Sequence, residues 1–314
     1  MSEILREHLE YLTLKGRNAL YREALQAVVR DQDVVADLGC GIGVLGLLAL
    51  EAGAGKVYGI DHSDAIHLAR ETMARAGLGD RYECIHGSTF KTDLPEKADV
   101  LICDHIGYFG TDYGIVDMVR DARERMLRED GRIVPDRFQL HIAAASSDDC
   151  LAKAEVWRAE EIPDQFRWLD EQAHNARYPH DFALEEFCSD GVPLGGIDLA
   201  SGDEAIFAFT ATLSITRPCR FDGLAGWFSA HLGGDVWMTN SPLDNAAIGR
   251  SQAFLPVAEP FAVHEGDAID VKVRAGSDGQ LLAWTVKPPQ LRGAPQTMST
   301  WASIALAQGQ GGRR

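Results

Sequence analysis

The stretch Val34-Val35-Ala36-Asp37-Leu38-Gly39-Cys40-Gly41-Ile42-Gly43 decides the fold of this chain. Its apolar run at residues 34–38 predicts a short buried strand. The three glycines that follow let the backbone turn tightly and approach a ligand closely. Residues 43–52, rich in Leu and Ala, predict a helix directly after the turn. A strand, a glycine-rich loop and a helix in this order are typical of a cofactor loop in an α/β sheet.

Asp37 ends the predicted strand just before the glycines. A dinucleotide would place its pyrophosphate at the helix N-terminus, where this carboxylate would oppose it. A carboxylate suits a cation instead, such as the ammonium of the methionine part of S-adenosylmethionine (SAM). Asp61 ends the next predicted strand, 24 residues later, where an acid can accept both ribose hydroxyls. The pair favours SAM over NAD(P), which stays the alternative, and over a tight turn without a ligand.

We expect the SAM site to draw on three corners of the predicted sheet. An ordinary polar turn explains the third corner equally well. The expected cofactor-binding residues are Asp37, Gly39, Cys40, Gly41 and Gly43 of the loop, Asp61 and His62 after the second strand, and Ser88 and Thr89 after the third.

The two halves of the chain have different hydrophobic periods. Strand-like runs at 34–38, 57–60, 82–85 and 100–103 alternate with helical stretches at 43–52, 64–76 and 115–127, which predicts a parallel sheet covered by helices. After Val134-Pro135-Asp136, period-two alternation at 207–215, 269–273 and 282–286 predicts antiparallel sheet, as a barrel or a sandwich. We expect both Trp237 and Trp284 in the core of this second half.

These patterns predict an α/β plus β fold with two domains. Residues 1–135 form a SAM-binding, Rossmann-like domain with N-terminal helices, and residues 136–314 form an antiparallel β-barrel-like domain. The polar segment at about 151–187 predicts a helical insertion into the second domain. The Gln- and Gly-rich tail at 308–314 is expected to be disordered.

Composition narrows the possible partners. The chain has 314 residues and a formal net charge of -17, which repels phosphate backbones and anionic lipids and attracts cationic substrates. We therefore expect no nucleic acid and no membrane as partners, and no apolar run approaches the roughly 18 residues of a membrane span. The charged N-terminus is not a signal peptide in pattern. The six cysteines show neither CxxC nor zinc-type spacing, which predicts reduced thiols, no metal site and a cytoplasmic protein.

From about Arg17 to Val286 the sequence resembles the protein arginine methyltransferase family. The segments that carry the resemblance are residues 17–21, 34–43 and 57–63, the stretch 94–109, the junction 134–137 and the loop 239–242. The resemblance implies SAM-dependent methyl transfer, a Rossmann-like domain joined to a β-barrel, and a head-to-tail homodimer. The dimerisation arm would be the insertion at about 151–187.

The sequence departs from the family in the catalytic loop. The family's first glutamate falls on Asp104, one methylene shorter, and its second falls on Tyr113, with Asp112 beside it. A tyrosine does not supply the negative charge that a guanidinium needs. The family's Thr-His-Trp histidine is absent from residues 247–252, and its N-terminal Tyr/Phe motif, which closes over the cofactor, has no counterpart. Candidates for the family's carboxylate-binding arginine are Lys15, Arg17 and Arg22.

Asp104 lies at the carboxyl end of the fourth predicted strand, where open α/β sheets place their chemistry. We expect it to orient or deprotonate the methyl acceptor, although a loop-capping role also explains an aspartate there. His105 is a second candidate base. Asp112 and Tyr113 are further active-site candidates.

Three functions fit these observations. The first is SAM-dependent methyl transfer to a nitrogen, such as an arginine guanidinium or a related cationic nitrogen, in a peptide or a free amino acid. The second is methyl transfer to an imidazole, indole or phenol of a natural-product peptide or metabolite, which the broken glutamate pair favours. The third is a catalytically weak SAM-binding interaction protein, which the intact cofactor loop disfavours.

Overall fold

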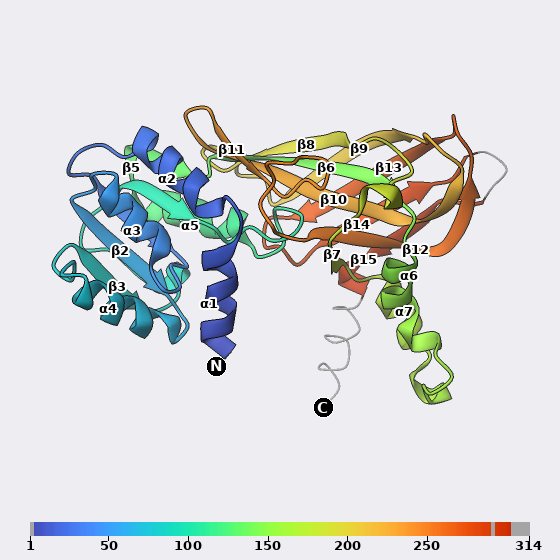
Figure 1. Cartoon of the computed structure of the whole chain (residues 1–314), viewed down its shortest axis with the longest axis horizontal. Coiled ribbons are helices and arrows are strands. Elements are labelled where there is room, and N and C mark those ends of the chain that lie inside the picture. The colour runs from blue at the N-terminus through green and yellow to red at the C-terminus, as the bar shows by residue number, and fades with distance from the viewer. Residues whose placement is uncertain (1–2, 290–292, 303–314) are drawn as a thin grey trace.

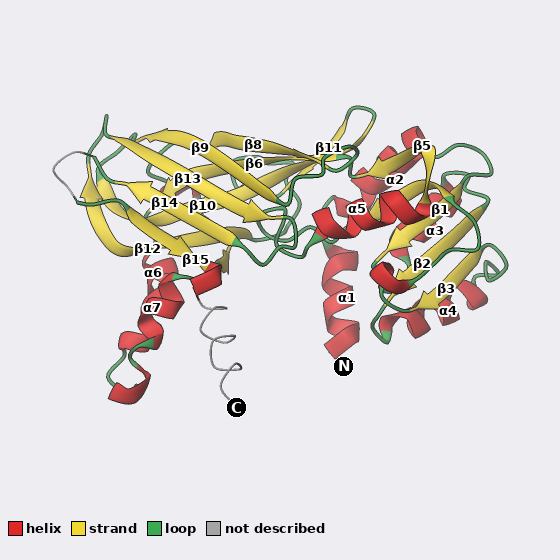
Figure 2. Cartoon of the chain, turned by 180° about the vertical axis from the view of Figure 1, so that it is seen from behind, coloured by secondary structure: helices red, strands yellow, loops and turns green. Residues whose placement is uncertain are grey.

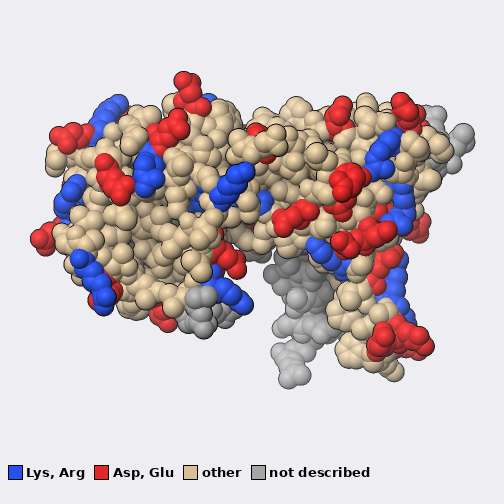
Figure 3. Space-filling view, in the orientation of Figure 1, with Lys and Arg blue, Asp and Glu red and all other residues tan. Residues whose placement is uncertain are grey.

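The computed structural model describes residues 3–289 and 293–302 of the chain. A parallel sheet and its helices form one lobe, antiparallel strands form an elongated second lobe, and a short helical arm projects from the latter (Figure 1). The tail at 308–314, predicted to be disordered, lies outside the described residues. On the face drawn in Figure 3, acidic and basic side chains are spread over both lobes and the arm rather than gathered into one patch.

The first lobe is built on five parallel strands in the order β3-β2-β1-β4-β5. The strand order reverses at β1, which pairs with both β2 and β4, and ligands of open α/β sheets bind outside the carboxyl ends at such a point. The strands are β1 (Val34–Leu38), β2 (Lys56–Asp61), β3 (Tyr82–His86), β4 (Ala98–Cys103) and β5 (Leu127–Val134).

Five helices and one 3-10 turn accompany this sheet in the described chain. Each of the strands and helices predicted here is present, with ends shifted by a few residues at most. The helices are α1 (Glu3–Thr13), α2 (Arg17–Val28), α3 (Val44–Glu51), α4 (Ala65–Arg75) and α5 (Ile115–Met126), and the turn is η1 (Thr89–Lys91).

The second lobe consists of two antiparallel sheets (Figure 2). One holds β7 (Tyr178–His180), β12 (Gln252–Val263), β10 (Cys219–Gly233), β6 (Arg137–Ala145) and β8 (Val192–Asp198) in that order, with β11 (Val236–Thr239) paired to β10. The other holds β15 (Gln296–Ser299), β14 (Leu282–Lys287), β13 (Ala268–Gly276) and β9 (Ile206–Ser214). A parallel sheet followed by antiparallel sheets confirms the predicted fold class.

The period-two pattern identified most of the core of this lobe. Buried and exposed residues alternate along β13, and Trp284 on β14 is fully buried, as predicted. The same prediction for Trp237 is wrong, because its side chain is 45% exposed. Trp237 lies on the short outer strand β11, where the guanidinium of Arg137 covers its ring at 5.4 Å from the centroid.

The insertion after β6 begins as the arm and ends in the sheet. The arm comprises α6 (Asp148–Glu155), η2 (Val156–Arg158), η3 (Asp164–Phe166) and α7 (Leu169–His174). After it the chain returns to pair β7 with β12 and forms the turn η4 (Leu184–Glu186). Only the first part of the segment predicted to be helical is therefore helical.

The cysteines differ from the prediction in one pair. Cys188 and Cys219 form a disulfide with a Cα–Cα distance of 6.6 Å, whereas Cys40, Cys84, Cys103 and Cys150 are free. The prediction of reduced thiols is wrong for this pair, because the fold brings the chain back beside Cys188 after β8 and β9, at a sequence separation of 31. No described helix is long and apolar enough to cross a membrane. The described residues hold no group of three or more His, Cys, Asp or Glu side chains able to bind a metal ion.

Candidate functional site

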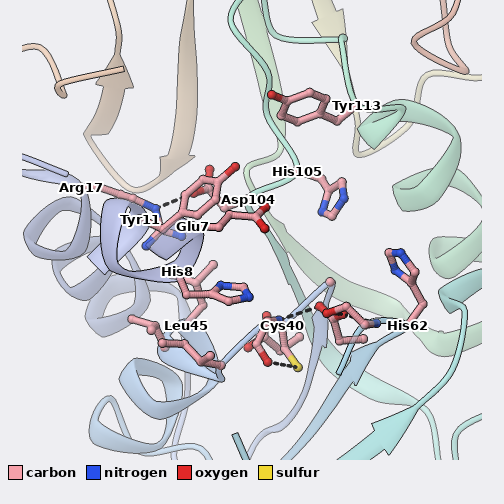
Figure 4. A pocket seen from close by; sticks show the side chains of 17 residues that line it. Glu7, His8, Tyr11, Arg17, Cys40, Leu45, His62, Asp104, His105 and Tyr113 are labelled. Carbon is pink, nitrogen blue, oxygen red and sulfur yellow. Dashed lines mark hydrogen bonds and ion pairs between the residues drawn. The ribbon is translucent and has the colours of Figure 1, made fainter. Parts of the chain in front are cut away.

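A cavity of about 510 Å³ lies at the carboxyl ends of β1, β2 and β4, and helix α1 covers one side of it (Figure 4). Nine of the predicted site residues line its wall together: Asp37, Gly39, Cys40, Gly41, Asp61, His62, Asp104, His105 and Tyr113. The other residues of the wall are Glu7, His8, Tyr11, Arg17, Ile42, Val44, Leu45 and Ser63. Gly43, Ser88, Thr89 and Asp112 lie outside the wall that the described residues form.

The glycine-rich loop is held between two imidazole rings. Gly39 and Gly41 both have positive φ, 66° and 55°, which favours glycine. A Cβ on Gly39 would lie 2.7 Å from His105 Nδ1, and one on Gly41 would lie 2.7 Å from His8 Cε1. Both positions therefore require glycine for conformation and for space, and the bare backbone stays open to the cavity.

Asp37 is buried below the loop. Its Oδ2 accepts hydrogen bonds from the Gly46 amide at 2.8 Å and the Tyr82 hydroxyl at 3.2 Å. Burial raises the pKa of Asp37 to about 7, even though both hydrogen bonds oppose that rise. A cation placed beside this carboxyl group would complete its ionisation.

Asp61 ties the loop to the second strand. One carboxylate oxygen accepts the Gly41 amide at 2.7 Å, and the other accepts the Ser63 amide at 2.8 Å and the Ser63 hydroxyl at 2.7 Å. A carboxylate offers about two acceptor sites on each oxygen, so Asp61 Oδ2 can still accept one further hydrogen bond from a ligand in the cavity.

Three of the predicted cofactor residues, Gly43, Ser88 and Thr89, do not line the cavity. Gly43 precedes helix α3. Thr89 is buried in η1, and its carbonyl accepts a hydrogen bond from Arg125 Nη2 of α5 at 2.6 Å. The Ser88 carbonyl accepts one from Thr92 Oγ1 at 2.9 Å. These contacts give Ser88 and Thr89 a structural role in the third corner, and their binding role stays a prediction.

Asp104 is the centre of the site. Its Oδ2 accepts hydrogen bonds from Arg17 Nε at 2.5 Å and from Arg250 Nη2 at 3.1 Å. All three side chains are at least nine-tenths buried. Burial favours the neutral acid, but the two guanidinium groups, Arg250 first, outweigh it and hold the pKa of Asp104 below its ordinary value. Among the described residues nothing donates to the buried Oδ1, which leaves one anionic oxygen unpartnered.

Arg17 is the basic residue that lines the cavity. Of the other two candidates, Lys15 reaches the Asn245 carbonyl at 3.4 Å and Arg22 pairs with Glu51 at 3.4 Å, both on the surface. No sequence motif marked Arg250 as part of the site. It lies between β11 and β12 and also donates to the Ile106 carbonyl at 2.7 Å. It occupies the stretch 247–252, where the family's histidine is absent.

The loop after β4 presents Tyr113 to the cavity and turns Asp112 away. The Asp112 carboxylate accepts the Phe109 amide at 2.7 Å and lies 3.6 Å from Arg177 Nη1. Burial and a hydrogen bond with Tyr108 raise the pKa of Tyr113, which keeps its phenol neutral. Burial lowers the pKa of His105, so its imidazole is neutral at pH 7. Asp104 is therefore the fixed negative charge that this loop supplies.

The charged side chains along the cavity wall follow the same order as the polar groups of SAM that they would bind. Asp37 suits the ammonium, Arg17 the carboxylate and Asp61 a ribose hydroxyl. Within the described residues Arg17 donates through Nε to Asp104 and through Nη1 to Asn18, which leaves Nη2 for a ligand. A cavity of 510 Å³ is also within the usual range for cofactor sites.

Comparison with known proteins finds methyltransferases. The family model described as ribosomal protein L11 methyltransferase (PrmA) matches residues 19–134. Protein arginine N-methyltransferase 1 of Schizosaccharomyces pombe is 38% identical over 146 residues, 45% of this chain and 43% of that protein. Arginine N(omega)-methyltransferase of Streptomyces achromogenes subsp. streptozoticus is 26% identical over 275 residues, 85% of this chain and 75% of that protein.

A solved structure extends the likeness to the whole fold. The Trypanosoma brucei PRMT1 enzyme-prozyme heterotetrameric complex with AdoHcy has a TM-score of 0.80 at 21% identity, covering 93% of this chain and 97% of that one. The chain thus resembles the protein arginine methyltransferases, as its motifs predict. The match to the S. pombe relative spans less than half of that protein, 43% of its length.

Proposed function

We propose that this chain is a SAM-dependent arginine N-methyltransferase, which transfers a methyl group to a guanidinium nitrogen or a related cationic nitrogen. The observation that carries the proposal is Asp104, whose Oδ1 is buried, anionic and unpartnered beside the cofactor cavity. The names of the S. pombe and S. achromogenes relatives support it.

Different residues bind the cofactor and orient the methyl acceptor. When bound, SAM supplies an electrophilic methyl group on its sulfonium. Asp37, Asp61 and Arg17 hold the cofactor, which fixes where the methyl lies. Asp104 Oδ1 accepts an N–H of the acceptor and aligns the nitrogen with that methyl, since alignment is the main requirement of an in-line displacement.

One proton must leave the acceptor nitrogen for each methyl added. Because its pKa is lowered, Asp104 is a poor proton acceptor and stays negatively charged. The neutral His105 lines the same cavity and is the better base. We assign orientation and charge to Asp104 and proton acceptance to His105.

A second candidate is methyl transfer to an uncharged nitrogen or a phenol. The observation that favours it is the double pairing of Asp104 with Arg17 and Arg250, which leaves this cluster with a positive charge. Turnover of L-arginine compared with imidazole, indole and phenol acceptors separates the two.

Asp104→Asn tests the proposal. It keeps the shape and removes the anion, so turnover should fall by at least about 100-fold, the usual cost of losing one positioning group. The Kd of SAM, measured by calorimetry, should change little. Asp64→Asn, an exposed aspartate at the start of α4, is the matched control. Unchanged turnover in the Asp104 variant would remove this residue from the mechanism.

The same proposal includes the architecture of the protein. The parallel sheet ends at Val134 and the antiparallel sheet begins at Arg137, which supports a domain boundary at residue 135. The arm exposes Val156, Phe166 and Trp168 by 53%, 51% and 58%, which supports a homodimer made through the arm. Four of the six cysteines are free, which supports a cytoplasmic location, whereas the Cys188–Cys219 disulfide weighs against it.

A further inference from the structure

A second cavity, of about 310 Å³, adjoins the cofactor cavity. Both cavities share Glu7, Tyr11 and Tyr113, so these three side chains stand at the passage between them. The wall of the second cavity comes from helix α1, the loop after β4 and the loop before β12. Its residues are Glu7, Glu10, Tyr11, Leu14, Ile106, Gly107, Tyr108, Tyr113, Gly249, Arg250 and Ser251.

Tyrosine rings form much of this passage. Burial raises the pKa of Tyr11, and the phenol of Tyr113 is neutral for the same reason, so neither supplies a negative charge. Their faces are nevertheless suited to a cation, and the guanidinium of Arg250 already lies 5.8 Å from the centroid of the Tyr11 ring.

The negative charge of the passage comes from helix α1. Glu7 and Glu10 lie on its exposed side, one turn apart, and no described residue pairs with either carboxylate. In Figure 4 the side chain of Glu7 reaches from α1 into the hollow, beside Tyr11 and across from His105. Arg250 lies in the same wall, and its ion pair with Asp104 offsets part of its positive charge.

The carboxylate of Asp104 is a second, independent indication that a ligand binds beside Glu7. Its Oδ1 is buried and accepts no hydrogen bond within the described part of the chain. A buried carboxylate oxygen left without a donor is costly, so the arrangement is completed when a bound N–H group reaches it. A planar guanidinium presents N–H groups in two directions, and two separate carboxylates can therefore bind it.

We infer that Glu7 is a specificity-determining residue for the methyl acceptor, and that it holds an alkylguanidinium jointly with Asp104 Oδ1. The acceptor enters through the 310 Å³ cavity, and its cationic head lies between the carboxylates of Glu7 and Asp104, which both line the cofactor cavity. The loop after β4 supplies one carboxylate, Asp104, and the neutral Tyr113. Helix α1 supplies the second carboxylate, Glu7. This inference rests on the proposed function, since it names the residue that selects the substrate of that site.

The test uses the full chain with S-adenosylhomocysteine bound, and measures the Kd of agmatine, an alkylguanidinium, by calorimetry. Its comparison ligand is carbamoylputrescine, in which a neutral urea replaces the guanidinium. Glu7→Gln should weaken agmatine binding by about 5- to 10-fold, as expected for one charge-assisted pair that is partly exposed. The Kd of SAM should stay within about twofold. Glu23→Gln, on the exposed side of α2, removes the same charge away from both cavities and should change neither value.

Three outcomes overturn the inference, and they differ in what else fails. Unchanged agmatine binding in the Glu7 variant removes Glu7 from the acceptor site and leaves the proposed function standing. An equal loss of SAM affinity makes Glu7 a cofactor residue. If the wild-type chain binds agmatine no better than carbamoylputrescine and does not methylate L-arginine, the proposed function fails together with the inference.

Discussion

Arg250→Met removes the guanidinium that the second lobe contributes to Asp104. The two groups are 3.1 Å apart, and both side chains are more than nine-tenths buried. An opposite charge this close lowers the pKa of an aspartate by about 1 to 3 pH units. With Arg250 gone, burial is opposed mainly by Arg17, so the pKa of Asp104 should rise.

The assay is the pH dependence of kcat/KM for L-arginine, measured at saturating SAM so that Asp37 does not titrate. In the wild type, the Asp104 carboxylate is ionised throughout the range in which the enzyme can be assayed. In the variant, the acid limb that belongs to Asp104 should move upward by about 1 to 3 pH units. An acid limb due to His105 would be present in the pH profiles of both proteins. The difference between the two profiles therefore reports the titration of Asp104. Arg250→Lys keeps the charge and should keep the wild-type profile.

Stability gives a second readout with a definite sign. A depressed carboxyl pKa contributes stability above the pKa of the unfolded chain, and this is lost as pH falls through the folded value. The loss of one partner from a buried pair costs about 3–5 kcal/mol, and we expect about 3 because Arg17 stays. The free energies of unfolding of the wild type and the Met variant should therefore differ at pH 7, and the difference should shrink as the pH falls through the folded pKa of Asp104. An acid limb that does not move in the folded Met variant would refute the role assigned to Arg250.

Three further predictions follow from single side chains. Asp61→Ala should weaken SAM binding by about 1–3 kcal/mol, because the loop amide and the ribose both lose an acceptor; a normal Kd would contradict this. SAM affinity should fall by up to about tenfold per pH unit below pH 7, as Asp37 takes up a proton, and Asp37→Asn should abolish this dependence in calorimetry. Trp168→Glu on the arm should convert the dimer to a monomer in sedimentation at micromolar concentration, and a wild type that already sediments as a monomer refutes the dimer.

The cofactor side of the site could be predicted from the sequence because its information is local. Asp37 and Asp61 each end a strand with a clear apolar pattern, and neighbouring parallel strands bring their carboxyl ends to one edge of the sheet. Period two likewise placed Trp284 in the core. The prediction that Trp237 also lies in the core failed, because Trp237 lies on the outward-facing side of the short outer strand β11.

The acceptor side depends on contacts that no local pattern encodes. Arg250 lies 146 residues from Asp104 along the chain, and only the packing of the two lobes brings them together. Helix α1 carries no motif that marks Glu7 or His8 as part of a cavity. The sequence did not show whether Asp112 or Tyr113 lines the cavity. In the structure the Phe109 amide donates a hydrogen bond to Asp112, which turns that carboxylate away and leaves Tyr113 in the cavity wall.

The second lobe therefore takes a direct part in the chemistry that we propose. Asp104 follows a strand of the first lobe, yet Arg250, from the loop before β12 of the second lobe, acts together with Arg17 to hold it ionised. The same arginine also binds the Ile106 carbonyl, so it fixes both the charge and the course of the loop after β4. A change in how the lobes pack would shift Asp104 and its pKa together, whereas Asp37 and Asp61 lie entirely within the first lobe. Cofactor binding should thus tolerate disturbance of the lobe interface far better than turnover does.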